Sequence, residues 1–142
     1  MEYTLQHFLQ LVLSFFLGAI IGAEREYIGK AAGMRTFSLV AMGSTLFTIL
    51  SREGFLIENA KTDPSRIAAA IVMGLGFLLA GLIIFKGEKV EGLTTAAALW
   101  STAAIGMAVG CQFYLLAFLT TIFIFLILNV MKKIRLEERF KK

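Results

Sequence analysis

The sequence predicts an all-α integral membrane protein, a bundle of about five transmembrane helices. Of its 142 residues, 58% are hydrophobic and only 17% are charged, whereas about a quarter of the residues in a soluble domain are charged. The mean hydropathy is +0.79, and the charged residues lie between long apolar runs. The net charge of +4 does not indicate nucleic-acid binding, because basic residues at the ends of apolar runs are typical of topology signals.

The spans follow from the roughly 20 helical residues that cross about 30 Å of hydrocarbon. Tyr3–Ala23 has this length, and we interpret it as a retained span because no basic region precedes it and no cleavage site follows. Met34–Leu50 is shorter. A full span and a re-entrant segment both fit this run, so a bundle of four spans is the alternative.

The third run is Ile67–Phe85, and Asp63-Pro64 precedes it as a helix start, with Asp as the N-cap and Pro at the first helical position. Leu93–Gly110 is the fourth run. Small residues (Gly, Ala, Ser, Thr) make up 13 of the 19 residues from position 92 to 110, which favours a central helix surrounded by protein. A tight turn then leads into the fifth run, Phe113–Met131.

Lysine and arginine in the connecting segments predict the orientation. Eleven of them lie on one side: Arg25, Lys30, Arg35, Lys86, Lys89, Lys132, Lys133, Arg135, Arg139, Lys141 and Lys142. The other side has Arg52, Lys61 and Arg66. We therefore expect the N-terminus outside and the C-terminus in the cytoplasm, with a transmembrane domain at 1–131 and a basic tail at 132–142 that contacts anionic lipid.

Glycines in several runs predict close helix packing, which matters in lipid because apolar burial drives association weakly there. At about 100° per residue, Arg25 falls in the same stripe as Gly18 and Gly22, while Glu24 lies on the far side and faces water. Arg25→Ala is then more harmful than Glu24→Ala. In the alternative interpretation, the three charged side chains at positions 24–26 are all solvated at the end of the first span and form what we call a solvated collar. The packing set is Gly18, Gly22, Gly74, Gly81, Gly106 and Gly110.

Thr94 and Ser101 share one face of the fourth run, with Trp100 roughly opposite. Their hydroxyls either pack between helices or line a wet passage. The sequence contains no nucleophile–base arrangement, phosphate-binding loop or metal-binding histidine pair, and its single cysteine excludes an internal disulfide. We therefore expect no enzymatic activity.

Three segments, IGAEREYIGKAAGMRTFSLVAMGS, DPSRIAAAIVMGLGFLLAG and KVEGLTTAAALWSTAAIGMAVG, resemble the hydrophobic domain of the MgtC/SapB family. The resemblance covers Leu11 to Leu128. One departure is Leu79, where the family commonly has glycine. Many members continue into a cytoplasmic C-terminal domain, whereas this sequence stops at Lys142, so we expect a short member without it.

The resemblance implies a multi-pass protein of the bacterial plasma (inner) membrane, associated with adaptation to low magnesium and with virulence. Two functions stay open. The first is a regulator or interaction partner in the membrane; the alternative is a transporter or channel for Mg²⁺ or another cation. The glycine faces also predict a homo-oligomer, in particular a dimer, and other membrane proteins are expected partners.

The predicted topology places the charged segment after the first run and the charged segment before the fourth run together at the cytoplasmic end of the bundle. Carboxylates and hydroxyls suit hard cations such as Mg²⁺, whereas arginines suit phosphate; a set of salt bridges is the alternative. Arg25 is expected to pair with Glu91 or with Glu26 of a neighbouring chain. No cofactor is expected, with Mg²⁺ as the one exception considered. The candidate site is Glu24, Arg25, Glu26, Arg35, Thr36, Glu91, Gly92, Thr94, Thr95 and Ser101.

Overall fold

A computed structural model describes the backbone of residues 2–55 and 63–140 and the side chains of residues 4–55 and 63–131. Its elements are α1 (Glu2–Tyr27), α2 (Met34–Ile49), the π-helical turn η1 (Leu50–Gly54), α3 (Ser65–Ala80), β1 (Ile84–Lys86), β2 (Lys89–Glu91), α4 (Leu93–Gly110) and α5 (Tyr114–Phe140). The predicted all-α bundle is confirmed.

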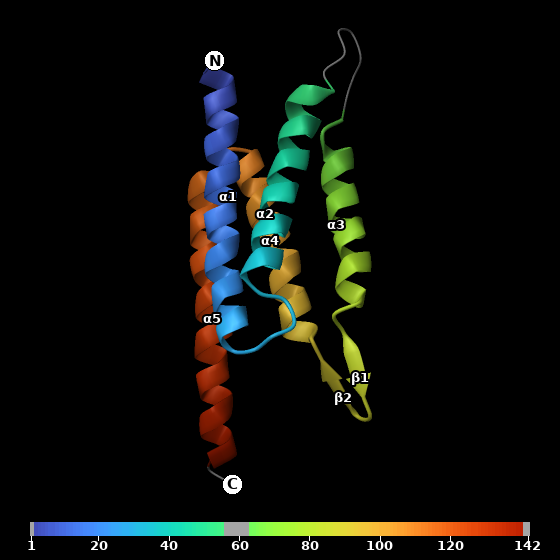
Figure 1. Cartoon of the computed structure of the whole chain (residues 1–142), viewed down its shortest axis with the longest axis vertical. Helices are drawn as coiled ribbons and strands as arrows, with labels where there is room; N and C mark the ends of the chain where they lie inside the picture. Colours follow the sequence, from blue (N-terminus) through green and yellow to red (C-terminus); the bar gives the residue numbers. More distant parts are fainter. Residues whose placement is uncertain (1, 56–62, 141–142) are drawn as a thin grey trace.

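Successive helices run in opposite directions (Figure 1). The α1–α2 connection, the β1–β2 hairpin and the end of α5 lie together, and we call this the hairpin end. The N-terminus and the α4–α5 turn lie at the opposite end. This alternation matches five crossings, whereas the side of the membrane that each end faces stays a prediction.

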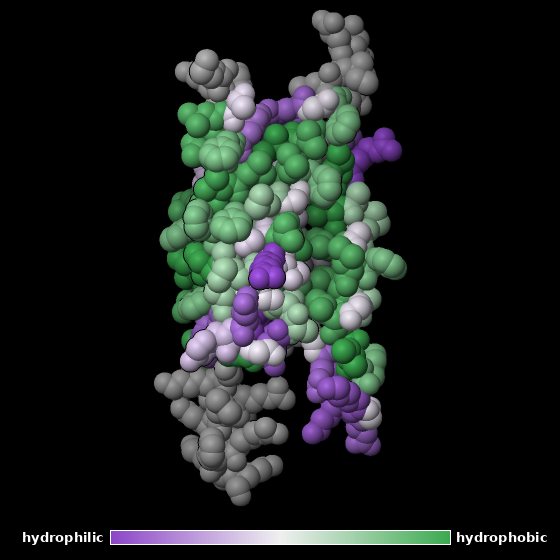
Figure 2. Space-filling model, in the orientation of Figure 1, coloured by the Kyte–Doolittle hydropathy of each residue, from purple (hydrophilic) through white to green (hydrophobic). Residues whose placement is uncertain are grey.

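Apolar side chains cover the middle of the molecule and hydrophilic ones gather toward its ends (Figure 2). Four helices are long and apolar enough to cross a membrane, namely Thr4–Tyr27, Met34–Gly54, Leu93–Gly110 and Tyr114–Met131. The second of these continues from α2 through η1, which favours a full span over a re-entrant segment. The remaining apolar helix, α3, has 16 residues and is therefore shorter than a typical span.

The predicted third span, Ile67–Phe85, is wrong at its C-terminal end. The helix stops at Ala80, and strands β1 and β2 pair antiparallel with Phe85 opposite Val90. The reason is local, because Gly87 supplies a positive φ of 60° at the turn between the two strands. At the start of α3, Asp63 Oδ1 accepts a hydrogen bond of 2.9 Å from the Ser65 backbone N–H, although the N-cap of α3 is Pro64 and not the predicted Asp63.

Helix α4 occupies the centre, as its small residues predict. It contacts α1, α2, α3 and α5, and 56% of its span is buried against 17% for the apolar span of α5. A Cβ at Gly106 would overlap the Ala41 carbonyl oxygen of α2, and one at Gly110 would lie 2.6 Å from the Thr48 Cβ. Larger residues at these two positions would force α2 and α4 apart.

Two polar side chains secure α4 at the opposite end of the bundle. Gln10 Nε2 donates to the Val109 carbonyl at 2.8 Å, and Arg52 Nη1 donates to the Gly110 carbonyl at 2.9 Å. These bonds satisfy carbonyls that a helix C-terminus leaves without intrahelical partners. Helix α5 continues at the hairpin end through 132–140 of the predicted tail; the basic side chains of that tail lie outside the described residues.

Candidate functional site

The site begins where α1 and α2 cross in close contact. A Cβ at Gly22 would lie 2.6 Å from the Met34 Cα, and one at Gly18 would lie 2.6 Å from the Phe37 carbonyl oxygen. Neither place accommodates a side chain. The two backbones therefore touch, and the last turn of α1, which carries Glu24 and Arg25, is held against the start of α2.

Glu24 and Arg25 form a buried ion pair at this point. The Nε–H of Arg25 donates to Glu24 Oε2, and the two side chains are only 3% and 6% exposed, respectively. The expectation that Glu24 faces water is therefore wrong. Helices α4 and α5 also contact α1, so α1 has protein neighbours besides α2.

The second oxygen of the Glu24 carboxylate is unsatisfied. Oε1 is buried and has no hydrogen-bond partner among the described residues. An ionised carboxylate is an acceptor at both oxygens, and leaving a buried acceptor unpaired costs about 1–3 kcal/mol, more when it is charged. This atom therefore marks a place where a donor or a cation would be stabilised.

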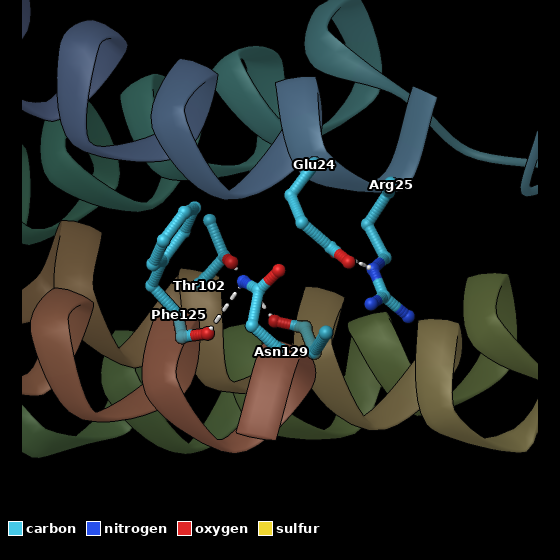
Figure 3. A network of polar contacts seen from close by, with 6 residues as sticks. Glu24, Arg25, Thr102, Phe125 and Asn129 are labelled. Atoms are coloured by element: carbon cyan, nitrogen blue, oxygen red, sulfur yellow. Dashed lines mark hydrogen bonds and ion pairs between the residues drawn. The ribbon is translucent and has the colours of Figure 1, made fainter. Parts of the chain in front are cut away.

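Two further polar residues lie beside the pair, Thr102 of α4 and Asn129 of α5. Figure 3 shows the side chains of Thr102 and Asn129 in the same region as Glu24, whose carboxylate turns toward Arg25. The Thr102 hydroxyl donates to the Ala98 carbonyl, and Asn129 Nδ2 donates to the Phe125 carbonyl, both at 2.8 Å.

Sequence reasoning missed both of these residues, although signals were present. Asn129 is a lone amide within an apolar span, and polar residues inside a membrane are often functional. Thr102 lies seven residues after Thr95 and therefore on the same helical face. The buried face of α4 carries Thr95 and Thr102, not the predicted pair Thr94 and Ser101.

The predicted partner of Arg25 is also wrong. Glu91 lies in the hairpin, where its carboxylate is 2.8 Å from the Lys86 ammonium. The hydrogen bond and the charge of Lys86 lower the pKa of Glu91. Glu26 is exposed, and its Oε2 accepts a 2.9 Å hydrogen bond from the Met34 backbone N–H, at the first turn of α2.

The other predicted site residues surround this centre without joining it. Arg35 and Thr36 are exposed in the first turn of α2, and Thr94 is exposed in the first turn of α4. Gly92 precedes α4 with a positive φ of 88°, where a Cβ would overlap the Leu82 carbonyl oxygen. The Ser101 hydroxyl donates to the Ala97 carbonyl at 2.9 Å.

The predicted packing glycines fall into two groups. Gly18, Gly22, Gly106 and Gly110 lie at contacts of α2 with α1 or α4. A Cβ at Gly74 would meet nothing within 4 Å, and one at Gly81 would meet only the Leu78 carbonyl oxygen, at 3.5 Å. Within the described residues, no group of three or more His, Cys, Asp or Glu side chains is placed to hold a metal ion.

Comparison with known proteins gives one family match and several relatives. The model of the MgtC family matches residues 11–136. A protein of Escherichia coli strain K12 named "Putative magnesium transporter YhiD" is 43% identical over 131 residues, which cover 89% of this chain and 61% of that protein. Protein SrpB of Synechococcus elongatus is 41% identical over 89% of this chain and 75% of its own length.

A third relative is Protein MgtC of Brucella abortus, which is 42% identical over 78% of this chain and 45% of its own length. The chain thus spans less than two thirds of the YhiD and MgtC relatives. No solved structure gives a significant match to it.

Proposed function

The chain belongs to the MgtC family, and we propose that it acts in the bacterial inner membrane as a regulator or interaction partner during adaptation to low magnesium. A role under stress or in virulence belongs to the same proposal. The link to magnesium draws support from the name of the YhiD relative. The preference for regulation over transport comes from the interior of the bundle.

The buried charges of the bundle favour regulation. Among the described residues, the buried ionisable side chains are Glu24 and Arg25, and they pair with each other near the hairpin end. Ionisable groups along a membrane interior usually mark ion pathways. The buried Thr48, Thr102 and Thr121 each donate to a carbonyl four residues earlier in their own helix. The Thr45 hydroxyl lies 2.8 Å from the Gly106 carbonyl of α4 and 3.0 Å from the Ala41 carbonyl of its own helix. These observations support a packed interior over a continuous polar path.

Transport of a cation is the second candidate, and one observation favours it. The unpaired Oε1 of Glu24 is an anionic acceptor inside the bundle, and the name of the YhiD relative includes transport of magnesium. A transport path for a cation would have to run from one end of the bundle to the other past this atom.

Ion flux into proteoliposomes decides between the two candidates. We expect the purified chain to give no uptake of Mg²⁺ or K⁺ above that of empty vesicles, while the same chain restores growth of a deletion strain under magnesium limitation. Selective, protein-dependent uptake that Glu24→Gln abolishes would replace regulation by transport. Failure to restore growth, together with no uptake, would contradict both candidates.

We also propose that the chain forms a homo-oligomer, with a dimer as the simplest form. The observation behind this is α3, where a Cβ at Gly74 or Gly76 would meet nothing within 4 Å. Small residues let membrane helices approach closely, so this helix can accept a second copy. Native mass measurement in mild detergent tests it, and a monomer at all protein concentrations would contradict it.

A further inference from the structure

The β1–β2 hairpin is exposed along both of its strands. All three residues of each strand are exposed, and a two-stranded hairpin by itself is at best marginally stable in water. The hairpin projects past the apolar middle of the molecule at the hairpin end (Figure 1, Figure 2). We therefore expect contacts with a surface outside the chain to contribute to its order.

The length of the preceding helix places the hairpin in the headgroup layer of the membrane. Helix α3 has 16 residues, which rise about 24 Å, and three more residues lead from its end to β1. The hydrocarbon is about 30 Å thick, and each headgroup layer adds about 5–8 Å. A three-residue strand rises about 10 Å, so β1 and β2 are long enough to cross this layer on one side.

The two faces of the hairpin differ in chemistry, because cross-strand partners lie on the same face. Phe85 pairs with Val90, and these apolar side chains are 76% and 43% exposed, respectively. Lys86 pairs with Lys89 on the other face, one position nearer to the turn. Apolar side chains near the helices, with lysine ammonium groups beyond them, suit a membrane surface.

The charged face carries an excess of positive charge. Lys86 and Lys89 are direct partners, and like charges at such positions destabilise an antiparallel pair. The Glu91 carboxylate lies 2.8 Å from the Lys86 ammonium. The hydrogen bond and the charge of Lys86 lower the pKa of Glu91, and the charges of Lys30 and Lys89 lower it further. Three ammonium groups thus lie near one carboxylate, and they outnumber the negative charges even when Glu88 of the turn is counted.

We propose that Lys86, Lys89 and Lys30 bind the phosphate of an anionic phospholipid in the leaflet at the hairpin end. Among the described residues, Lys30 and Lys89 form no ion pair, so both can bind a phosphate oxygen. The negative charge relieves the repulsion between Lys86 and Lys89, while Phe85 and Val90 contact the apolar side of the headgroup layer. Because β1 follows α3 and β2 precedes α4, bound lipid stabilises the ends of two helices.

Thermal melting of the purified full chain in a neutral detergent tests this surface, with short-chain phosphatidylglycerol as the ligand and phosphatidylcholine of the same chain length as the reference. We expect only phosphatidylglycerol to raise the melting temperature, because a ligand of the folded state stabilises it by mass action. Lys89→Gln should raise the phosphatidylglycerol concentration at half of the effect about fivefold, the factor for one lysine near an anionic surface. Lys89→Arg should keep the wild-type value.

The matched control is Arg66→Gln, which removes one exposed positive charge at the other end of α3 and should leave the titration unchanged. Phe85→Ser should weaken binding, because it removes an apolar contact. Lys89, Arg66 and Phe85 are all exposed, so these variants should fold.

Three results would overturn the proposal. Equal rises with the two lipids, or no rise with either, would leave a protein as the occupant of the hairpin. The same rise with inorganic phosphate would identify a site for free phosphate. A titration that Lys89→Gln and Phe85→Ser leave unchanged, or that Arg66→Gln shifts equally, would place the lipid elsewhere on the chain.

Discussion

Glu24 and Arg25 are neighbours in the chain, yet both side chains are buried and paired. The structure therefore replaces the expectation that Glu24→Ala is the milder change. Removing one member of a buried pair leaves the other charge uncompensated, which costs about 3–5 kcal/mol. We expect Arg25→Ala and Glu24→Ala to lower the free energy of unfolding by similar amounts, measured by thermal melting in detergent.

The matched control for this pair is the double variant Glu24→Met/Arg25→Met. Because it leaves no unpaired charge, its loss of stability should be clearly smaller than the sum of the two single losses. Arg25→Lys should keep only part of the stability, since lysine lacks the planar guanidinium. If both alanine variants melt like the wild type, positions 24–26 form a solvated collar and the site is withdrawn.

The close contact between α1 and α2 depends on glycine, which gives a testable prediction about the packing of these two helices. A Cβ at Gly22 would lie 2.6 Å from the Met34 Cα, a backbone atom that cannot rotate away. Gly22→Ala should therefore cost about 1–3 kcal/mol through overpacking, measured by the melting temperature. Gly74→Ala is the control, because its Cβ meets nothing within 4 Å. It should be neutral or stabilise α3 by at most about 1 kcal/mol; equal losses in both would contradict the close contact.

Hydropathy and charge predicted most helices, because the thickness of the bilayer sets their length and charged residues mark their ends. Hydropathy and charge did not predict the C-terminal end of α3. The run from Ile67 to Phe85 is apolar throughout, so composition alone continues the helix. What stops it is a pairing between β1 and β2 with Gly87 at the turn. Strand pairing depends on residues on both sides of a turn, which a hydropathy window does not register.

At the scale of the whole molecule, the sequence placed α4 in the centre but did not reveal the site around it. Helical periodicity gives the angle between two side chains on one helix. It does not say which neighbour covers each face. Periodicity therefore predicts that Glu24 faces water, although its side chain is buried and paired with Arg25. Asn129 and Thr102 lie 105 and 78 positions from Glu24 in the sequence, and only the packing of three helices brings them together (Figure 3).

The orientation of the bundle gives the last prediction. Five alternating helices place the α4–α5 turn and the β1–β2 hairpin at opposite ends (Figure 1), and the excess of lysine and arginine at the hairpin end predicts that this end is cytoplasmic. Cys111, the single cysteine, lies in the α4–α5 turn and is partly exposed. A membrane-impermeant thiol reagent should therefore label it in intact bacterial spheroplasts.

The counterpart is Lys89→Cys in a Cys111→Ser background, which moves the thiol to the exposed hairpin. This variant should be labelled only after the membrane is opened. The inverse pattern would reverse the orientation and place the Glu24–Arg25 pair near the outer face. Labelling of both positions from one side would contradict an odd number of crossings between them, and α4, the helix that joins the two segments, would then not span the bilayer.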